Sequence, residues 1–154
     1  SWNNLKIEDL KIEKNSIDVQ GLELRENIKN GGFYVVKAQK AEVSEDFKFI
    51  SMTSCNIFYK TDRYEVNIFS DVCQMVRDEN IVLRENITGS FDGYSFKTGE
   101  KGLFKYDFKT RRGKITNGVT IDSNGMKLKA DEGEFDKVNM EIRFLGNVEV
   151  DYAG

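Results

Sequence analysis

The chain of 154 residues contains neither histidine nor proline. Without histidine it cannot use Ser-His-Asp or Cys-His catalysis, and it cannot build a histidine-containing zinc site. Without proline its turns depend on glycine, asparagine and aspartate. The absence of histidine is the strongest single argument against a common hydrolase.

Long apolar segments and a strong net charge are also missing. No run of about 18 apolar residues is present, so no segment is predicted to span a membrane, and no signal peptide is recognisable. The formal net charge is −3, which argues against nucleic-acid binding driven by overall charge. With 39% hydrophobic and 32% charged residues, the composition is that of an ordinary folded domain.

Cysteine is scarce: only Cys55 and Cys73 are present, so at most one disulfide can form. We favour two small buried hydrophobic residues, with a disulfide as the alternative. If a tight hairpin at 61–62 joins their strands within one sheet, Cys55 lies opposite residue 68 and Cys73 opposite residue 50. The Cα atoms would then lie well beyond the roughly 7 Å limit for a bridge. We therefore predict no bond between the two.

What the chain does contain is a cryptic repeat. Tyr34, Tyr64 and Tyr94 are 30 residues apart, and Met126 takes the fourth place 32 residues further on. Each begins a stretch of alternating apolar residues. An asparagine near an aliphatic residue closes each copy: Asn56-Ile57, Asn86-Ile87, Asn117 with Val119, and Asn147-Val148. A fixed period of this size indicates stacked or serially wound units rather than a catalytic domain.

Alternation of apolar and polar residues dominates the whole chain. The alternating runs are rich in Val, Ile, Phe and Tyr, and no segment keeps a helical period. Turn-forming residues precede three of the four copies, at Asn30-Gly31-Gly32, Asp92-Gly93 and Asn124-Gly125. We therefore predict an all-β sandwich, barrel or jelly roll, with residues 1–154 as a single domain.

Small residues recur three positions apart in the first and fourth copies, as Ala38 and Ala41 and as Ala130 and Gly133. A strand that bends sharply or receives a close neighbour cannot carry a bulky side chain there. These pairs predict a bend where the chain passes from one sheet to another.

One face of the repeat forms an apolar stripe. Its members are Tyr34, Val36, Tyr64, Val66, Tyr94, Phe96, Met126 and Leu128, with Ile57, Ile87, Val119 and Val148 from the closing strands. The stripe predicts that Tyr34, Tyr64, Tyr94, Phe96 and Met126 point between the sheets, while Val35, Glu65, Ser95 and Lys127 point outward. It fits either a packed core or a groove that admits acyl chains, and the residues alone do not separate these readings.

Two charged clusters are candidate sites. Glu132, Glu134 and Asp136 alternate on one strand face, which suits either a cation site or, as we favour, a solvated outer face. Residues 97–114 hold seven Lys and Arg against two acids, which suits a phosphate-bearing partner. We favour a charged hairpin that keeps a strand edge soluble.

Several stretches together resemble a known family. Residues 32–38 with Ala41 and Val43 resemble the opening strand pattern of LptC. The OstA-type repeat that LptC shares with LptA is matched by residues 126–130, Gly133, Phe135 and residues 145–150. The resemblance runs from about residue 17 to residue 152, and Asp71 and Lys101 depart from it because they replace the small residue of copies two and three. It favours LptC, since the segment before Gly31 leads directly into the pattern.

The resemblance implies an open, twisted β-jelly roll without enzymatic activity and without a cofactor or metal. Such a domain binds lipopolysaccharide, receives it from an inner-membrane LptB2FG-type ABC transporter and passes it along a periplasmic bridge to LptA. LptC is anchored to the inner membrane by an N-terminal helix, which this chain does not contain. The expected location is therefore periplasmic at that membrane, with no nucleic-acid partner and with a homodimer left open.

The resemblance also assigns candidate site residues. The expected lipid-binding residues are Tyr34, Val36, Ile57, Tyr64, Val66, Ile87, Tyr94, Phe96, Met126, Leu128 and Val148. A partner is expected to add to the edge of the last strand, 141–150, through Ile142, Phe144, Asn147 and Glu149. The alternatives are an LptA-like soluble bridge, a structural β-repeat domain with a closed core, and a jelly-roll enzyme with paired carboxylates in a cleft.

Overall fold

The computed structural model describes residues 5–13, 16–29 and 31–153. Within these ranges every regular element is a strand, and all paired strands are antiparallel. The strands are β1 (Leu5–Glu13), β2 (Ser16–Asn27), β3 (Gly32–Ser44), β4 (Phe49–Thr61), β5 (Glu65–Val76), β6 (Asn80–Arg84), β7 (Thr88–Phe91), β8 (Tyr94–Lys97), β9 (Leu103–Asp107), β10 (Arg112–Thr116), β11 (Val119–Ser123), β12 (Met126–Ala130), β13 (Glu132–Asp136), β14 (Glu141–Leu145) and β15 (Glu149–Tyr152). The predicted all-β class is confirmed.

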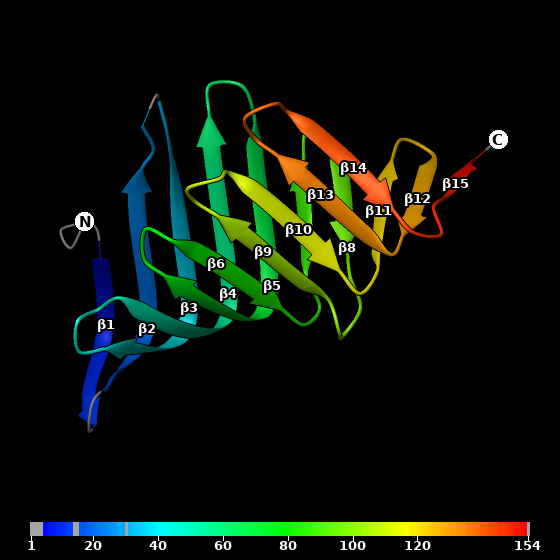
Figure 1. Ribbon diagram of the computed structural model, residues 1–154. Coiled ribbons are helices and arrows are strands. Elements are labelled where there is room, and N and C mark those ends of the chain that lie inside the picture. Colours follow the sequence, from blue (N-terminus) through cyan, green and yellow to red (C-terminus); the bar gives the residue numbers. More distant parts are fainter. Residues whose placement is uncertain (1–4, 14–15, 30, 154) are drawn as a thin grey trace.

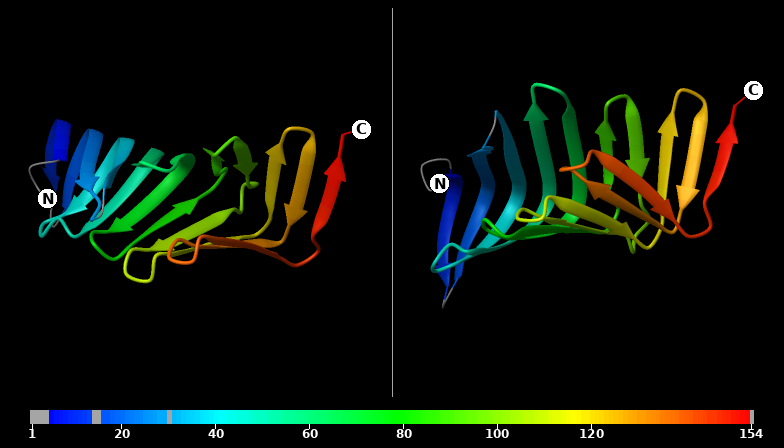
Figure 2. Two further views of the ribbon diagram at one scale, coloured as in Figure 1. Left: turned by 90° about the horizontal axis from the view of Figure 1, so that it is seen from above. Right: turned by 45° about the horizontal axis from the view of Figure 1, so that its top comes forward.

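The strands form one continuous sheet that is folded along its length into an open trough (Figures 1 and 2). Beyond β5, the short strands separate into two groups. We call β6, β9, β10, β13 and β14 the front half-sheet, and β7, β8, β11, β12 and β15 the back half-sheet. The long strands β2 to β5 run through the fold and contribute to both. β1 and β15 lie at opposite ends of the trough.

The fold line, which we call the corner, is visible in the strand registers. The pairing of β2 with β3, β3 with β4 and β4 with β5 each skips one pair, and the skipped residues are Gly21, Gln39, Ser54 and Asp71. Gly21 has φ 72° and Ser54 has φ 54°, so the backbone turns through the left-handed region there. Ala38 and Ala41 flank the skipped Gln39. The bend predicted from these small residues is confirmed.

Beyond β5 the corner is formed by loops between short strands rather than by bends within long strands. The residues that turn it have positive φ: Glu85 and Asn86, Asn117 and Gly118, and Gly146 and Asn147. Asparagine and glycine tolerate this conformation better than other residues. This requirement explains why an asparagine closes three copies of the repeat. Ala130 and Gly133 flank Asp131, whose backbone N–H donates to the Gly146 carbonyl across the corner at 2.8 Å.

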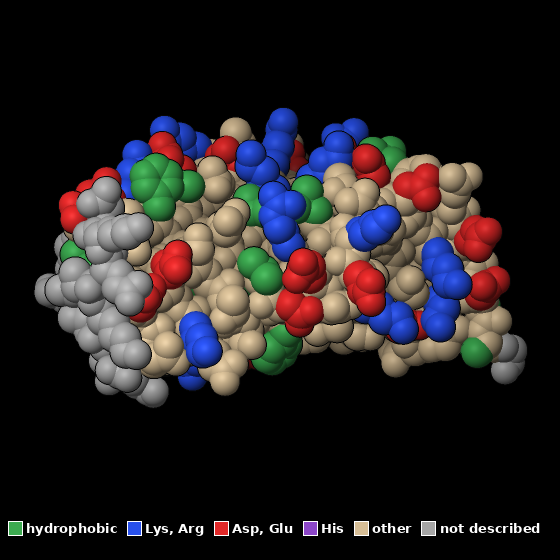
Figure 3. Space-filling view, turned by 90° about the horizontal axis from the view of Figure 1, so that it is seen from below, with side chains coloured by type: hydrophobic (Ala, Val, Ile, Leu, Met, Phe, Trp, Pro, Cys, Tyr) green, Lys and Arg blue, Asp and Glu red, His purple; other side chains and the backbone are tan. Residues whose placement is uncertain are grey.

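The tightly packed core lies inside the corner at the β2–β6 end of the trough. Its fully buried members include Leu24, Val43, Ile50, Met52 and Leu83. By contrast, the apolar side chains Ile142, Val148, Val150 and Tyr152 near the other end are exposed. Seen from below, the outer side of the molecule carries Lys, Arg, Asp and Glu side chains intermixed, with few hydrophobic ones (Figure 3). The apolar surface is therefore turned into the trough and toward its β14–β15 end.

Cys55 and Cys73 form a disulfide, so the prediction of unbonded cysteines is wrong. The register of β4 with β5 pairs Cys55 with Ser70 and Met52 with Cys73, rather than with residues 68 and 50. Two straight strands in this register would still keep the cysteines apart. The bend at Ser54 brings their Cα atoms to 6.3 Å from each other on its inner side, where both side chains are buried.

The last predicted strand, 141–150, is also corrected. The corner interrupts it at Gly146 and Asn147, so that β14 belongs to the front half-sheet and β15 to the back half-sheet. Because both are the final strands of their half-sheets, this end of the trough has two open strand edges.

Candidate binding groove

The two half-sheets enclose an apolar groove with a cavity of about 750 Å³. Side chains pointing inward from alternate strand positions form its walls. The front wall includes Leu83 from β6, Phe104 and Tyr106 from β9, Ile115 from β10 and Phe135 from β13. The opposite wall, which we call the back wall, is formed by aromatic and aliphatic residues of β3, β4, β5, β7, β8, β11 and β12.

Most of the predicted lipid-binding residues lie together on the back wall. The ones that line the groove are Tyr34, Val36, Ile57, Tyr64, Val66, Tyr94, Phe96, Met126 and Leu128. Their predicted outward neighbours Val35, Glu65, Ser95 and Lys127 do not line it, and the last three are exposed. The stripe thus faces the groove, although its member Tyr94 is itself 43% exposed.

Two of the predicted residues lie elsewhere. Ile87 is fully buried in the core at the corner, where its backbone N–H donates a hydrogen bond to Oγ1 of Thr98 at 3.1 Å. Val148 follows the corner residue Asn147 and is 47% exposed, outside the groove. Both directly follow asparagines with positive φ at the corner, Asn86 and Asn147, whereas Ile57 follows Asn56, which has no positive φ, and lines the groove.

The front wall was not identified from the sequence as part of the site. Phe104, Tyr106 and Phe108 alternate on and just after β9, and they line the groove. Ile142 and Phe144, which were assigned to a partner-binding edge, line it too. The alternation of apolar residues at 104, 106 and 108 does indicate an inward face. The predicted stripe takes its aromatic members from the strand that begins each copy, whereas later strands of the copies form the opposite wall.

Aromatic rings connect the two walls at the β3 end of the groove. The Tyr34 ring from β3 stacks on the Phe108 ring, with centroids 5.9 Å apart. Tyr106 packs edge-on against Phe108 at 5.7 Å. Burial raises the pKa of Tyr34 above its ordinary value, and Glu26 and Asp78 add to that shift. Burial likewise raises the pKa of Tyr106 to about 12. These ring contacts narrow the groove at this end.

At the middle of the mouth, the two half-sheets approach each other through the turn after β13. The Lys137 ammonium nitrogen lies 4.4 Å from the centroid of the Tyr59 ring on β4. The Tyr64 hydroxyl lies 3.8 Å from the Met140 sulfur. The Tyr59 hydroxyl is buried without a hydrogen-bond partner in the described structure, and burial raises its pKa. Arg111 lines the groove beside Lys137.

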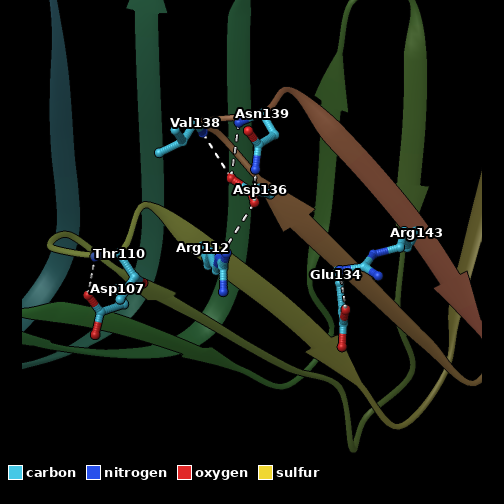
Figure 4. Close-up of polar contacts among 8 residues, drawn as sticks. All are labelled: Asp107, Thr110, Arg112, Glu134, Asp136, Val138, Asn139 and Arg143. Carbon is cyan, nitrogen blue, oxygen red and sulfur yellow. Dashed lines mark hydrogen bonds and ion pairs between the residues drawn. The ribbon is translucent and has the colours of Figure 1, made fainter.

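The acids of the front half-sheet are engaged in turns and ion pairs on its outer side (Figure 4). Asp136 accepts hydrogen bonds from the backbone N–H groups of Val138 and Asn139, which lowers its pKa, and it pairs with Arg112 at 3.5 Å. Glu134 lies 3.9 Å from Arg143, and Glu132 lies 3.4 Å from Lys114. These three half-buried acids therefore alternate with Gly133 and Phe135 along β13 and form an ion-paired face, and Glu134 also reaches the groove lining.

Among the described residues, no group of three or more His, Cys, Asp or Glu side chains is arranged to hold a metal ion. In the same part of the chain, no helix has the length and hydropathy needed to cross a membrane.

Comparison with known proteins identifies the fold. No protein-family model and no curated protein matches the chain. The chain is similar to the crystal structure of LptH from Pseudomonas aeruginosa, described as the LptA homologous periplasmic component of the conserved lipopolysaccharide transport device. The match has a TM-score of 0.52 and 7% sequence identity, and it covers 95% of this chain and 91% of that chain. The protein has an LptA-like β-jelly-roll fold.

At this level of identity the similarity establishes the fold alone. The expected jelly roll is confirmed, whereas the choice of LptC over LptA does not follow from the match. The four residues assigned to a partner-binding edge are divided by the corner. Ile142 and Phe144 lie in β14 of the front half-sheet, and Glu149 lies in β15 of the back half-sheet. Asn147 lies between them and donates a hydrogen bond to the Asp131 carboxylate at 2.9 Å.

Proposed function

We propose that this domain binds the acyl chains of lipopolysaccharide in its groove and passes the lipid to the next component of an export machine. The observation that carries the proposal is the continuous apolar groove of about 750 Å³ between the half-sheets. The groove argues against a structural repeat with a closed core. Of the three acids that reach its lining, Glu26, Asp78 and Glu134, the first and last form ion pairs with Arg77 at 3.1 Å and Arg143 at 3.9 Å. The proposal assigns the protein no reaction, cofactor or metal.

The physical reason is the cost of exposing acyl chains to water. Burial of each methylene contributes about 0.8 kcal/mol, so an apolar trough holds a lipid tail without chemical change. The groove remains open at the mouth, where a sugar headgroup would stay in water. Energy for directional movement would come from an ATPase elsewhere, the LptB2FG-type ABC transporter of the inner membrane.

The two open edges at the β14–β15 end suit a partner with the same fold. β14 and β15 end their half-sheets, and Ile142, Val150 and Tyr152 are exposed there. Addition of a partner strand to each edge would continue both walls of the groove into an LptA-like protein. A homodimer built in the same way is the alternative assembly.

The proposed location is the periplasm, with residues 1–154 as a single domain. The Cys55–Cys73 disulfide supports this location, because such bonds persist in oxidising compartments including the bacterial periplasm. Two assignments fit the fold. An LptC-like protein would be anchored to the inner membrane by an N-terminal helix, whereas an LptA-like protein would be a soluble bridge.

Site-specific crosslinking tests the groove. A photo-crosslinkable amino acid at Phe96 or Tyr64, which line the groove, should trap lipopolysaccharide when an active transporter is present. The same amino acid at the exposed neighbours Ser95 or Glu65 should trap none. Lipid crosslinks at none of the groove positions, or equally at both sets, would make the transport proposal untenable.

Proline substitution tests the docking edge. Successive N–H groups of an edge strand point alternately toward its neighbour and away from it. Glu149→Pro and Val150→Pro therefore form a matched pair in β15, which pairs with β12 on one side. The variant that loses the outward N–H should bind an LptA-like partner more weakly and unfold at the same temperature as the unmodified domain. The variant that loses the N–H directed to β12 should unfold at a lower temperature. Unchanged partner binding in both would exclude this edge.

A further inference from the structure

The front wall of the groove ends in two cations at its mouth. Along β10 the lining residues are Ile115, Gly113 and then Arg111, and along β13 they include Phe135 and then Lys137. The Lys137 backbone N–H donates to the Arg111 carbonyl at 2.9 Å, which holds the two residues side by side. The apolar rows of adjacent strands thus finish in neighbouring positive side chains.

These two cations have no acidic ion-pair partner in the described part of the chain. Within the described residues, neither Arg111 nor Lys137 makes an ion pair. The acids of their own turns are already occupied (Figure 4). Asp107 accepts hydrogen bonds from the backbone N–H groups of Lys109 and Thr110, at 2.8 and 2.9 Å. Asp136 accepts from its own turn and pairs with Arg112.

A buried hydroxyl donor lies beside them, on a ring that stacks on Tyr64. The Tyr59 hydroxyl is buried and makes no hydrogen bond in the described structure, while Lys137 lies over the same ring at 4.4 Å. Burying an unpaired hydroxyl is unfavourable, and so is placing two cations together. Consistent with this, burial lowers the pKa of Lys137, and the charge of Arg111 lowers it further. Each of these costs would be relieved by one bound anion.

We propose that Arg111, Lys137 and Tyr59 form a rim site for a phosphate monoester on the headgroup of the lipid whose acyl chains occupy the groove. The inference rests on the proposed lipid binding and deepens it. A guanidinium binds phosphate oxygens through a fork of N–H donors, and an ammonium adds a point charge. Because the cations end the apolar rows, tails in the groove place a phosphorylated headgroup at the rim.

The test compares a phosphorylated glycolipid of the lipid A type with the same glycolipid after enzymatic removal of its phosphates. The test variant carries Arg111→Gln and Lys137→Gln. The matched control carries Lys97→Gln and Lys129→Gln, which remove two charges from exposed residues that flank Thr120 and do not line the groove. The test variant should bind the phosphorylated glycolipid about tenfold more weakly and the dephosphorylated one unchanged. The control should match the unmodified protein with both lipids.

A second variant separates this role from packing. Tyr59→Phe keeps the ring under Lys137 and removes only the hydroxyl, so it should weaken binding of the phosphorylated glycolipid alone and leave the thermal midpoint equal or higher. Equal loss for both glycolipids in the double variant would mean a packing role and overturn the inference, as would no loss for either. Complete displacement of the lipid by millimolar inorganic phosphate would also overturn it, in favour of a free-anion site. If the unmodified protein binds neither glycolipid, the proposed function itself fails.

Discussion

Cys55 and Cys73 are joined across the corner, with Cα atoms 6.3 Å apart and a sequence separation of 18. The closed loop contains the tip of the β4–β5 hairpin, which carries Tyr59 and Tyr64 of the back wall. The bond therefore ties the bend of both strands to the part of the hairpin that forms the groove mouth.

Removing this disulfide should lower the stability of the domain. For a loop of this length, the loss of chain entropy in the unfolded state corresponds to about 3 kcal/mol. A double Cys55→Ala and Cys73→Ala variant should show that decrease in urea unfolding, and the unmodified protein should approach it when a reductant is added. The variant itself should not respond to reductant. An unchanged urea midpoint in both experiments would show that the bond does not stabilise the fold.

Gly89 on β7 faces the Phe96 ring of the neighbouring strand β8, and the two residues are register partners. A Cβ atom at Gly89 would clash with the Phe96 ring and lie 2.9 Å from the Asn67 carbonyl oxygen. Gly89→Ala should therefore displace the ring from its place on the back wall and destabilise the protein by about 1–3 kcal/mol in urea unfolding.

Gly99 provides the matched control for this substitution. A Cβ atom added at Gly99 would meet nothing within 4 Å, so Gly99→Ala should leave the urea midpoint nearly unchanged. If both variants unfold at the same urea concentration, the Phe96 ring is not held against Gly89 as the structure indicates.

The strand pattern and one wall of the groove could be predicted from the sequence because both depend on local alternation. The period of 30 residues placed Tyr34, Tyr64 and Tyr94 on a common face, and all three line the groove. The opposite wall was missed although Phe104 and Tyr106 alternate in the same way. Its strands follow the corner, so their inward face is set by a turn and not by the register of the first strand.

The disulfide and the rim of the groove depend on backbone conformations that cannot be predicted from the residue types. Ser54 adopts φ 54° and Arg111 adopts φ 57°, although neither residue type is typical of the left-handed region. The first conformation brings Cys55 to Cys73. The Lys137–Tyr59 contact joins β4 to the turn after β13, and no local pattern relates positions so far apart in the chain.

The buried tyrosines predict the response to alkaline pH. Burial raises the pKa values of Tyr34, Tyr59 and Tyr106, the last to about 12, from an ordinary value of about 10. Above pH 10 the unfolded chain loses these protons and the folded protein keeps them. The free energy of unfolding should therefore be highest below pH 10 and fall as the pH rises toward 12.

Tyrosinate absorbance measures this directly. The folded protein should show part of its absorbance change well above pH 10, and that late part should move to about pH 10 in urea. Tyr106→Phe should reduce the late part. A titration of the folded protein that already coincides with the urea titration would show that these rings are not buried in solution.

Asn147 links the corner to the β14–β15 end of the groove. Its φ is 47°, and its side-chain amide donates to the Asp131 carboxylate at 2.9 Å. Asn147→Gly accepts the backbone conformation and loses only this hydrogen bond, whereas Asn147→Ala loses the bond and also strains the backbone. We expect Asn147→Ala to be less stable than Asn147→Gly by about 1 kcal/mol in urea unfolding.

The strained corner should also shift β15 relative to β14, so Asn147→Ala should bind an LptA-like partner more weakly than Asn147→Gly does. If alanine is tolerated as well as glycine in both measurements, Asn147 does not set the angle between the two edge strands, and its side chain would be free to contact the partner itself.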